Sequence, residues 1–63
     1  MRAYFYRVDN QREQMTLTIE ERQENEFEFC VFSRVNPKNM ESVTLNKSDV
    51  LRLVRNLLER VSA

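Results

Sequence analysis

An apolar stripe at helical spacing runs through the last part of the chain and predicts an amphipathic helix from Lys47 onward. Arg52, Arg55, Asn56 and Glu59 fill the opposite side. At 100° per residue the stripe spans an arc of roughly 160°, typical of a surface helix that buries one wide face. The stripe consists of Val50, Leu51, Val54, Leu57, Leu58 and Val61, with Leu53 at its margin.

The start of this helix is specified by local signals. Asn46 is a favourable N-cap residue, and Asp49 stands at the third helical position, where a carboxylate faces the positive helix end. Leu45 before the cap and Val50 after it have the spacing of a hydrophobic staple. The cap therefore fixes where the helix begins.

Alternating patterns upstream predict strands over 3–8, 15–22 and 26–35, and a shorter strand over 41–45. Because the chain contains no glycine, positive φ angles should fall mainly on asparagine or aspartate. The expected turn markers are Asn10, Asn25, Asn36 and Asn39. The sequence thus predicts one small α+β domain over 1–63, an antiparallel β-β-β-β-α meander with the C-terminal helix packed on one face.

Side-chain alternation divides the predicted sheet into two faces. The face expected under the helix, here the inner face, carries Tyr4, Tyr6, Val8, Met15, Leu17, Ile19, Phe27, Phe29, Val31 and Val35. The opposite outer face carries Ala3, Phe5, Arg7, Thr16, Thr18, Cys30, Phe32, Arg34 and Thr44. Since the third strand is apolar on both sides, it reads as a central strand covered twice, and one helix covers only one face.

The pairing of the last strand stays open. A four-residue loop over 36–39 sets Val43 opposite Phe32 and Leu45 opposite Cys30, on the outer face. A loop longer by one residue, or a bulge, sets them opposite Ser33 and Val31 on the inner face. We favour the inner face, because it keeps Leu45 near the helix staple.

Composition limits both stability and chemistry. A 63-residue chain buries only about 60% of the surface that its unfolded form exposes. With one cysteine, Cys30, and no histidine, neither a disulfide nor a typical zinc site is available as a stabiliser. We therefore expect self-association, a cytoplasmic location, no cofactor and no metal. The N-terminal apolar run is too short for a signal peptide, and no segment suits a membrane span.

The net charge is zero, yet the charges are unevenly distributed. Residues 20–28 hold five glutamates against a single arginine, whereas 34–63 hold six basic against three acidic residues. Ordinary solvation of a hairpin tip and a helix back explains this pattern. Two complementary patches that orient a partner or a twin subunit are the alternative.

No catalytic motif is present: histidine bases, glycine-rich loops and nucleophile signatures are all missing from the sequence. Cys30 has Glu28 and Phe32 as its strand neighbours, neither of which would activate a thiol as a nucleophile, so a structural role is expected. The candidate binding residues are Phe5, Arg7, Phe32 and Arg34 on the outer face, with Arg52 and Arg55 as a secondary basic helix face. Aromatic and basic residues on an open sheet suit single-stranded nucleic acid. A cross-strand pair of Phe5 and Phe32, or their burial at a dimer interface, is the favoured alternative.

The run Phe32-Ser33-Arg34 through Val43-Thr44-Leu45-Asn46-Lys47-Ser48-Asp49-Val50 resembles the last strand and helix start of the small transcriptional coactivators that bind single-stranded DNA. The resemblance covers residues 27–60. It implies four strands, one C-terminal helix and dimerisation partly through that helix. The acidic second hairpin departs from the DNA-binding members, which tend to be basic there.

Two functions follow as hypotheses. The first is a non-enzymatic binding module that acts through protein–protein contacts as an adaptor or inhibitor and forms a homodimer. The second is a single-stranded nucleic-acid binder using the outer face, which the neutral net charge disfavours.

Overall fold

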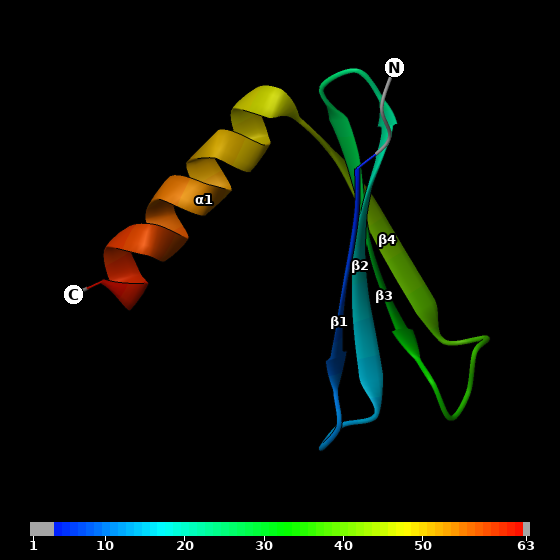
Figure 1. Cartoon of the computed structure of the whole chain (residues 1–63). Helices are drawn as coiled ribbons and strands as arrows, with labels where there is room; N and C mark the ends of the chain where they lie inside the picture. The colour runs from blue at the N-terminus through cyan, green and yellow to red at the C-terminus, as the bar shows by residue number, and fades with distance from the viewer. Residues whose placement is uncertain (1–3, 63) are drawn as a thin grey trace.

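Four antiparallel strands and one C-terminal helix form the protein, as a computed structural model describing residues 4–62 shows (Figure 1). The strands pair in the order β1-β2-β3-β4. This architecture confirms the predicted α+β meander. The elements are β1 (Phe5–Asn10), β2 (Met15–Gln23), β3 (Glu26–Ser33), β4 (Met40–Asn46) and α1 (Lys47–Val61).

The strand register assigns the inner and outer faces as the alternation predicts. Tyr6 lies opposite Ile19, which in turn lies opposite Phe29, so one row of the inner face crosses three strands. Arg7, Thr18 and Cys30 form the neighbouring row on the outer face. Ala3, also expected on the outer face, lies outside the described residues.

Strand ends and turns differ from the prediction in several places. β1 continues to Asn10, two residues beyond the predicted end. Asn25 has the expected positive φ of 63°, but Asn10, Asn36 and Asn39 do not. Gln14, in the turn before β2, is the other described residue with a positive φ, at 55°. Asn10 instead shapes that turn through its side chain, whose Oδ1 accepts the Glu13 N–H at 2.9 Å.

The third strand ends earlier than predicted because a serine turns the chain. The Ser33 hydroxyl accepts the backbone N–H groups of Val35 at 3.2 Å and Asn36 at 2.9 Å. Val35, expected on the inner face of the strand, therefore lies in the loop and is 70% exposed. The loop over 34–39 closes with the Ser33 N–H donating to the Asn39 carbonyl at 3.1 Å.

This loop also sets the register of β4. Val43 lies opposite Phe29 and Leu45 opposite Phe27, which places both on the inner face as favoured. The predicted pairing of Val43 with Ser33 and of Leu45 with Val31 was wrong. The loop begins two residues earlier than assumed, so β4 is displaced along β3 by four residues.

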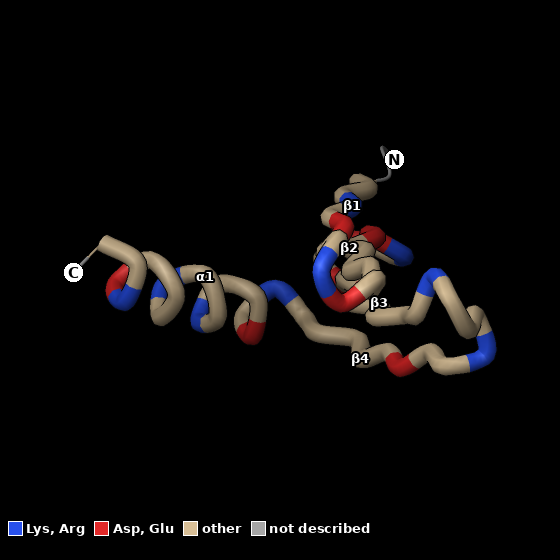
Figure 2. The backbone as a smooth tube through the Cα atoms, turned by 90° about the horizontal axis from the view of Figure 1, so that it is seen from below, with Lys and Arg blue, Asp and Glu red and all other residues tan. Residues whose placement is uncertain are grey.

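The helix begins as its sequence predicts. Asn46 is the N-cap, and its Oδ1 accepts the Asp49 N–H at 2.9 Å. The direction of the helix is less expected. α1 approaches only β4 and β3 of the described strands, and it diverges from the sheet toward its C-terminal end (Figures 1 and 2). Val50 is half-buried, but every residue over 51–62 is exposed.

Candidate functional site

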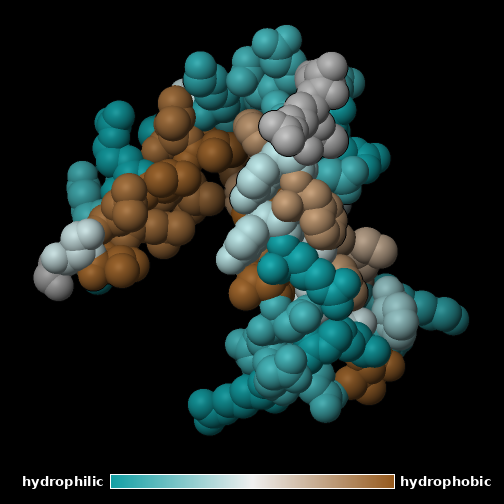
Figure 3. All heavy atoms as spheres, in the orientation of Figure 1, coloured by the Kyte–Doolittle hydropathy of each residue, from teal (hydrophilic) through white to brown (hydrophobic). Residues whose placement is uncertain are grey.

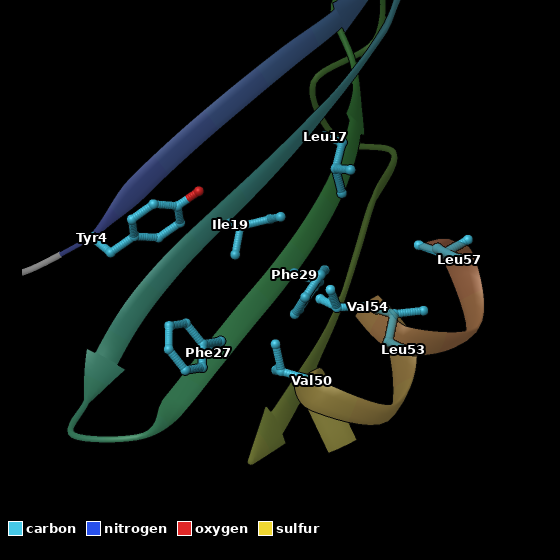
Figure 4. Close-up of a pocket in the computed structure, with 9 residues that line it drawn as sticks. All are labelled: Tyr4, Leu17, Ile19, Phe27, Phe29, Val50, Leu53, Val54 and Leu57. Atoms are coloured by element: carbon cyan, nitrogen blue, oxygen red, sulfur yellow. The ribbon is translucent and has the colours of Figure 1, made fainter. Parts of the chain in front are cut away.

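An open apolar groove separates α1 from the inner face of the sheet (Figure 4). Its volume is about 530 Å³. We call it the helix–sheet groove; it is lined by Tyr4, Leu17, Ile19, Phe27, Phe29, Val50, Leu53, Val54 and Leu57. No charged side chain belongs to this lining, which makes the groove suited to apolar partners.

The floor of the groove is built by the two-residue period of β2 and β3. Leu17 and Ile19 point to the same side of β2, and their neighbours Val31 and Phe29 continue the surface onto β3. Phe27 extends it toward the β2–β3 turn, opposite Leu45 of β4. Tyr4 directly precedes β1, and its carbonyl accepts the Glu21 N–H at 2.9 Å.

The wall of the groove is the apolar side of α1. Leu53 remains 37% exposed, Val54 45% and Leu57 54%, although all three face the groove. Figure 3 shows apolar surface gathered along the helix on the side toward the sheet, with open space between the end of the helix and the sheet. The helix is therefore amphipathic in the predicted sense, but residues 4–62 provide no surface that covers its apolar side.

Among the described residues, no hydrophobic side chain is fully buried. The chain exposes 5538 Å², whereas a compact monomer of 7.6 kDa exposes about 4,300 Å². The excess is roughly 1,200 Å². The radius of gyration, 13.2 Å, likewise exceeds the value of about 10.6 Å for a compact chain of this length. The fold is complete in topology but open in packing.

The outer face carries the densest polar network of the molecule, centred on Arg34. Its guanidinium donates to the Met15 carbonyl at 2.7 Å, to the Thr16 hydroxyl at 3.1 Å and to the Asn10 carbonyl at 3.2 Å. The Arg34 backbone N–H also donates to the Gln14 carbonyl at 3.0 Å. Arg34, the residue directly after β3, thus ties the end of that strand to the β1–β2 turn.

Asp9 completes this network. The Thr16 hydroxyl donates to Asp9 at 2.7 Å, and Arg7 and Arg34 stand 3.2 and 3.6 Å from the same carboxylate oxygen. The bond from Thr16 has the largest effect and holds the pKa of Asp9 below its ordinary value of 3.8. Partial desolvation opposes it, and both arginines lower the pKa further. Thr16 is only 1% exposed. Both predicted basic contacts of the outer face therefore engage a carboxylate of the same chain.

The two predicted aromatic contacts lie far apart. Phe5 shares a cross-strand row with Glu20 and Glu28, whereas Phe32 shares one with Thr16 and Asp9. Four residues along the strands and two strand spacings across the sheet correspond to about 16 Å between them. Phe5 is 61% exposed, and Phe32 is half-buried.

Charged side chains surround Phe5 on the outer face and make up the predicted basic face of the helix. Arg22 lies within 3.3 Å of Glu20 and 3.8 Å of Glu28, which keeps carboxylates beside Phe5. On the helix, Arg52 donates to Asp49 at 2.9 Å. Arg55 is exposed, on the side of α1 opposite the groove.

Cys30 is half-buried on the outer face, with a free thiol. Over residues 4–62, no three histidine, cysteine, aspartate or glutamate residues are grouped so that they could hold a metal ion. In the same range, α1 is too short and too polar to cross a membrane.

The helix–sheet groove was missed by sequence reasoning, which assumed that the helix closes over the inner face. A signal for it does exist. β4 ends at Asn46 and α1 begins at Lys47, so no connecting residue is available to redirect the helix across β1 and β2. The predicted binding residues of the outer face, by contrast, lie on the expected side. Arg7, Arg34 and Phe32 gather around Asp9 and Thr16, whereas Phe5 lies apart from them.

Comparison of the chain with protein-family models, with curated proteins and with solved structures finds no match.

Proposed function

We propose that this protein is a non-enzymatic binding module that acts through protein–protein contacts, as an adaptor or inhibitor, and that it functions as a homodimer. The observation that carries the proposal is the open helix–sheet groove in a chain without a fully buried hydrophobic residue over 4–62. Exposed apolar residues gathered in one contiguous groove are a feature of interaction sites rather than of stable monomers.

The size of the excess surface supports a dimer. A stable protein–protein interface of standard size takes about 800 Å² from each partner. The excess of roughly 1,200 Å² in this chain passes that value. Two copies that hide it together would bury about 2,400 Å², within the range of obligate homodimers.

The groove is also a more coherent contact surface than the outer face. Its nine lining residues are contiguous and uncharged, while the outer face alternates aromatic residues with carboxylates and paired arginines. Interface cores are depleted in charged residues and enriched in aromatic ones. Tyr4, Phe27 and Phe29 supply that aromatic content in the groove.

The test is a pair of substitutions on adjacent helix positions. Leu57→Asp places a carboxylate in the groove, whereas the control Asn56→Asp adds the same charge on the opposite side of α1. Loss of a buried leucine plus burial of a carboxylate should weaken dimerisation by about 100-fold or more. The control should change it by less than about threefold.

Analytical ultracentrifugation over a concentration series measures both dissociation constants. Circular dichroism on the same samples reports whether the monomers remain folded. Wild-type protein that stays monomeric at high micromolar concentration, with the helix formed, would refute the homodimer. Equal dissociation constants for the two variants would remove the groove from the interface.

A further inference from the structure

We propose that the helix–sheet groove receives the α1 helix of a second copy, with the two copies exchanging helices reciprocally and antiparallel. This inference rests on the proposed homodimer and specifies its geometry. Each helix would then lie against the sheet of its partner and against the partner's helix.

The width of the helix stripe favours this occupant over a small apolar ligand. Leu51, Leu58 and Val61 are 54%, 59% and 80% exposed, and none of them lines the groove. A ligand inside the groove would leave these three side chains in water. A second helix beside the first covers the groove and this flank together, because an arc of roughly 160° can contact two surfaces at once.

The dimensions of the two elements also match. α1 has 15 residues and is therefore about 22 Å long. β3 has eight residues and extends about 26 Å. One helix therefore spans the floor of the groove along the direction of the strands, and its apolar residues repeat along that whole length.

Charge favours the antiparallel orientation. Asn46 pairs with Glu26, so each helix starts at the end of its own sheet where the acidic β2–β3 turn lies (Figure 1). An antiparallel partner helix brings its C-terminal half, with Arg55 and Arg60, to that end. Glu21, on the inner face opposite Phe27, and Glu24 in the turn are then positioned to meet these arginines. A two-fold axis repeats the same contact in the other half.

Isotope-filtered NMR on the wild-type chain tests the exchange directly. Labelled (¹³C, ¹⁵N) and unlabelled protein are unfolded together, refolded and measured at a concentration where ultracentrifugation shows the dimer. We expect intermolecular contacts between the methyl groups of Leu57 and Ile19. In the described structure α1 approaches neither β1 nor β2. Isotope filtering selects contacts between a labelled and an unlabelled chain, so it separates a contact with the second copy from one within a chain.

A dimer whose intermolecular contacts join only helix to helix, or only strand to strand, would overturn the exchange and leave the proposed function intact. A monomer in which Leu57 contacts Ile19 of its own chain would overturn both, because the helix would then close over its own sheet.

Cross-linking of single-cysteine chains gives an independent measurement. In a Cys30→Ser background, Ile19→Cys and Leu57→Cys chains are mixed and treated with a short bismaleimide. The matched control replaces Ile19→Cys by Thr18→Cys, one residue along β2 but on the outer face. We expect the mixed cross-link to form several-fold faster with position 19 than with position 18. Equal rates would contradict the inner face as the docking surface.

Discussion

Replacing Arg34 by alanine is expected to destabilise the protein although the residue lies outside any regular element. The Arg34 guanidinium makes three hydrogen bonds to the β1–β2 turn region, with an ion pair to Asp9, and its side chain is only 25% exposed. Alanine leaves the carbonyls of Met15 and Asn10 without this donor. It also removes a donor from the hydroxyl of Thr16, the residue that is 1% exposed.

The magnitude follows from how much water can replace the guanidinium. Hydrogen bonds to a charged group are worth about 1.5–3 kcal/mol each when fully shielded. Three such bonds do not add, because water reaches the partly exposed Asn10 carbonyl once the side chain is gone. The loss at the buried Thr16 dominates, and we expect about 2 kcal/mol in total. For a chain of this size that corresponds to a fall in Tm of about 10 °C.

Urea unfolding at a fixed protein concentration measures this loss, since dissociation would otherwise add its own concentration dependence. Arg34→Lys is the control that retains the charge but not the planar fork, and it should recover about half of the loss. The two variants also distinguish a role of Arg34 in stability from a role in binding nucleic acid. Lysine keeps the positive charge that would bind phosphate but loses the fork that bonds the turn. A loss below about 0.5 kcal/mol for Arg34→Ala would refute the role of Arg34 in closing the turn.

Four further outcomes are expected. Because the pKa of Asp9 is lowered in the fold, its contribution to stability should be complete above its ordinary value of 3.8 and be lost as the pH falls through the lowered value. Acid titrations of wild type and Asp9→Asn check this, since the variant should lack that component. Asn46→Ala should cost about 1 kcal/mol in thermal unfolding by removing the helix cap. Fluorescence anisotropy with single-stranded oligonucleotides at low salt should show no binding that depends on Phe32, so a clear loss on Phe32→Ala would favour the nucleic-acid hypothesis. Four glycine and serine residues inserted between Leu45 and Asn46 should convert the proposed dimer to a monomer in ultracentrifugation, because the helix could then close over its own sheet.

The features that the sequence predicts correctly are those set by local spacing. The cap at Asn46 and the helix that follows depend on neighbours within one turn. The assignment of Leu17, Ile19 and Phe29 to one face needs only the two-residue period of a strand. Neither result requires knowledge of how distant segments meet, so both could be read from the chain.

The features that it misses depend on single side chains that act at a distance. The Ser33 hydroxyl bends the chain early and thereby displaces β4 by four residues along β3. Arg34, read as a phosphate contact, reaches back to the turn before β2 across 18 or more positions of sequence. Alternation gives the face of such a residue but not its partner.

The departure of α1 from the sheet links the fold to the proposed interface. A helix that follows a strand without a connecting residue inherits the direction in which that strand ends, and β4 is an edge strand. α1 is therefore held at the side of the sheet, over β4 and β3, while its apolar stripe is wide enough for two surfaces. The same direct junction at Asn46 that makes the helix start predictable from sequence keeps its own sheet from covering it. The uncovered inner face and the uncovered side of the helix thus have the same cause and are both apolar, and in the proposed homodimer a second copy would cover each of them.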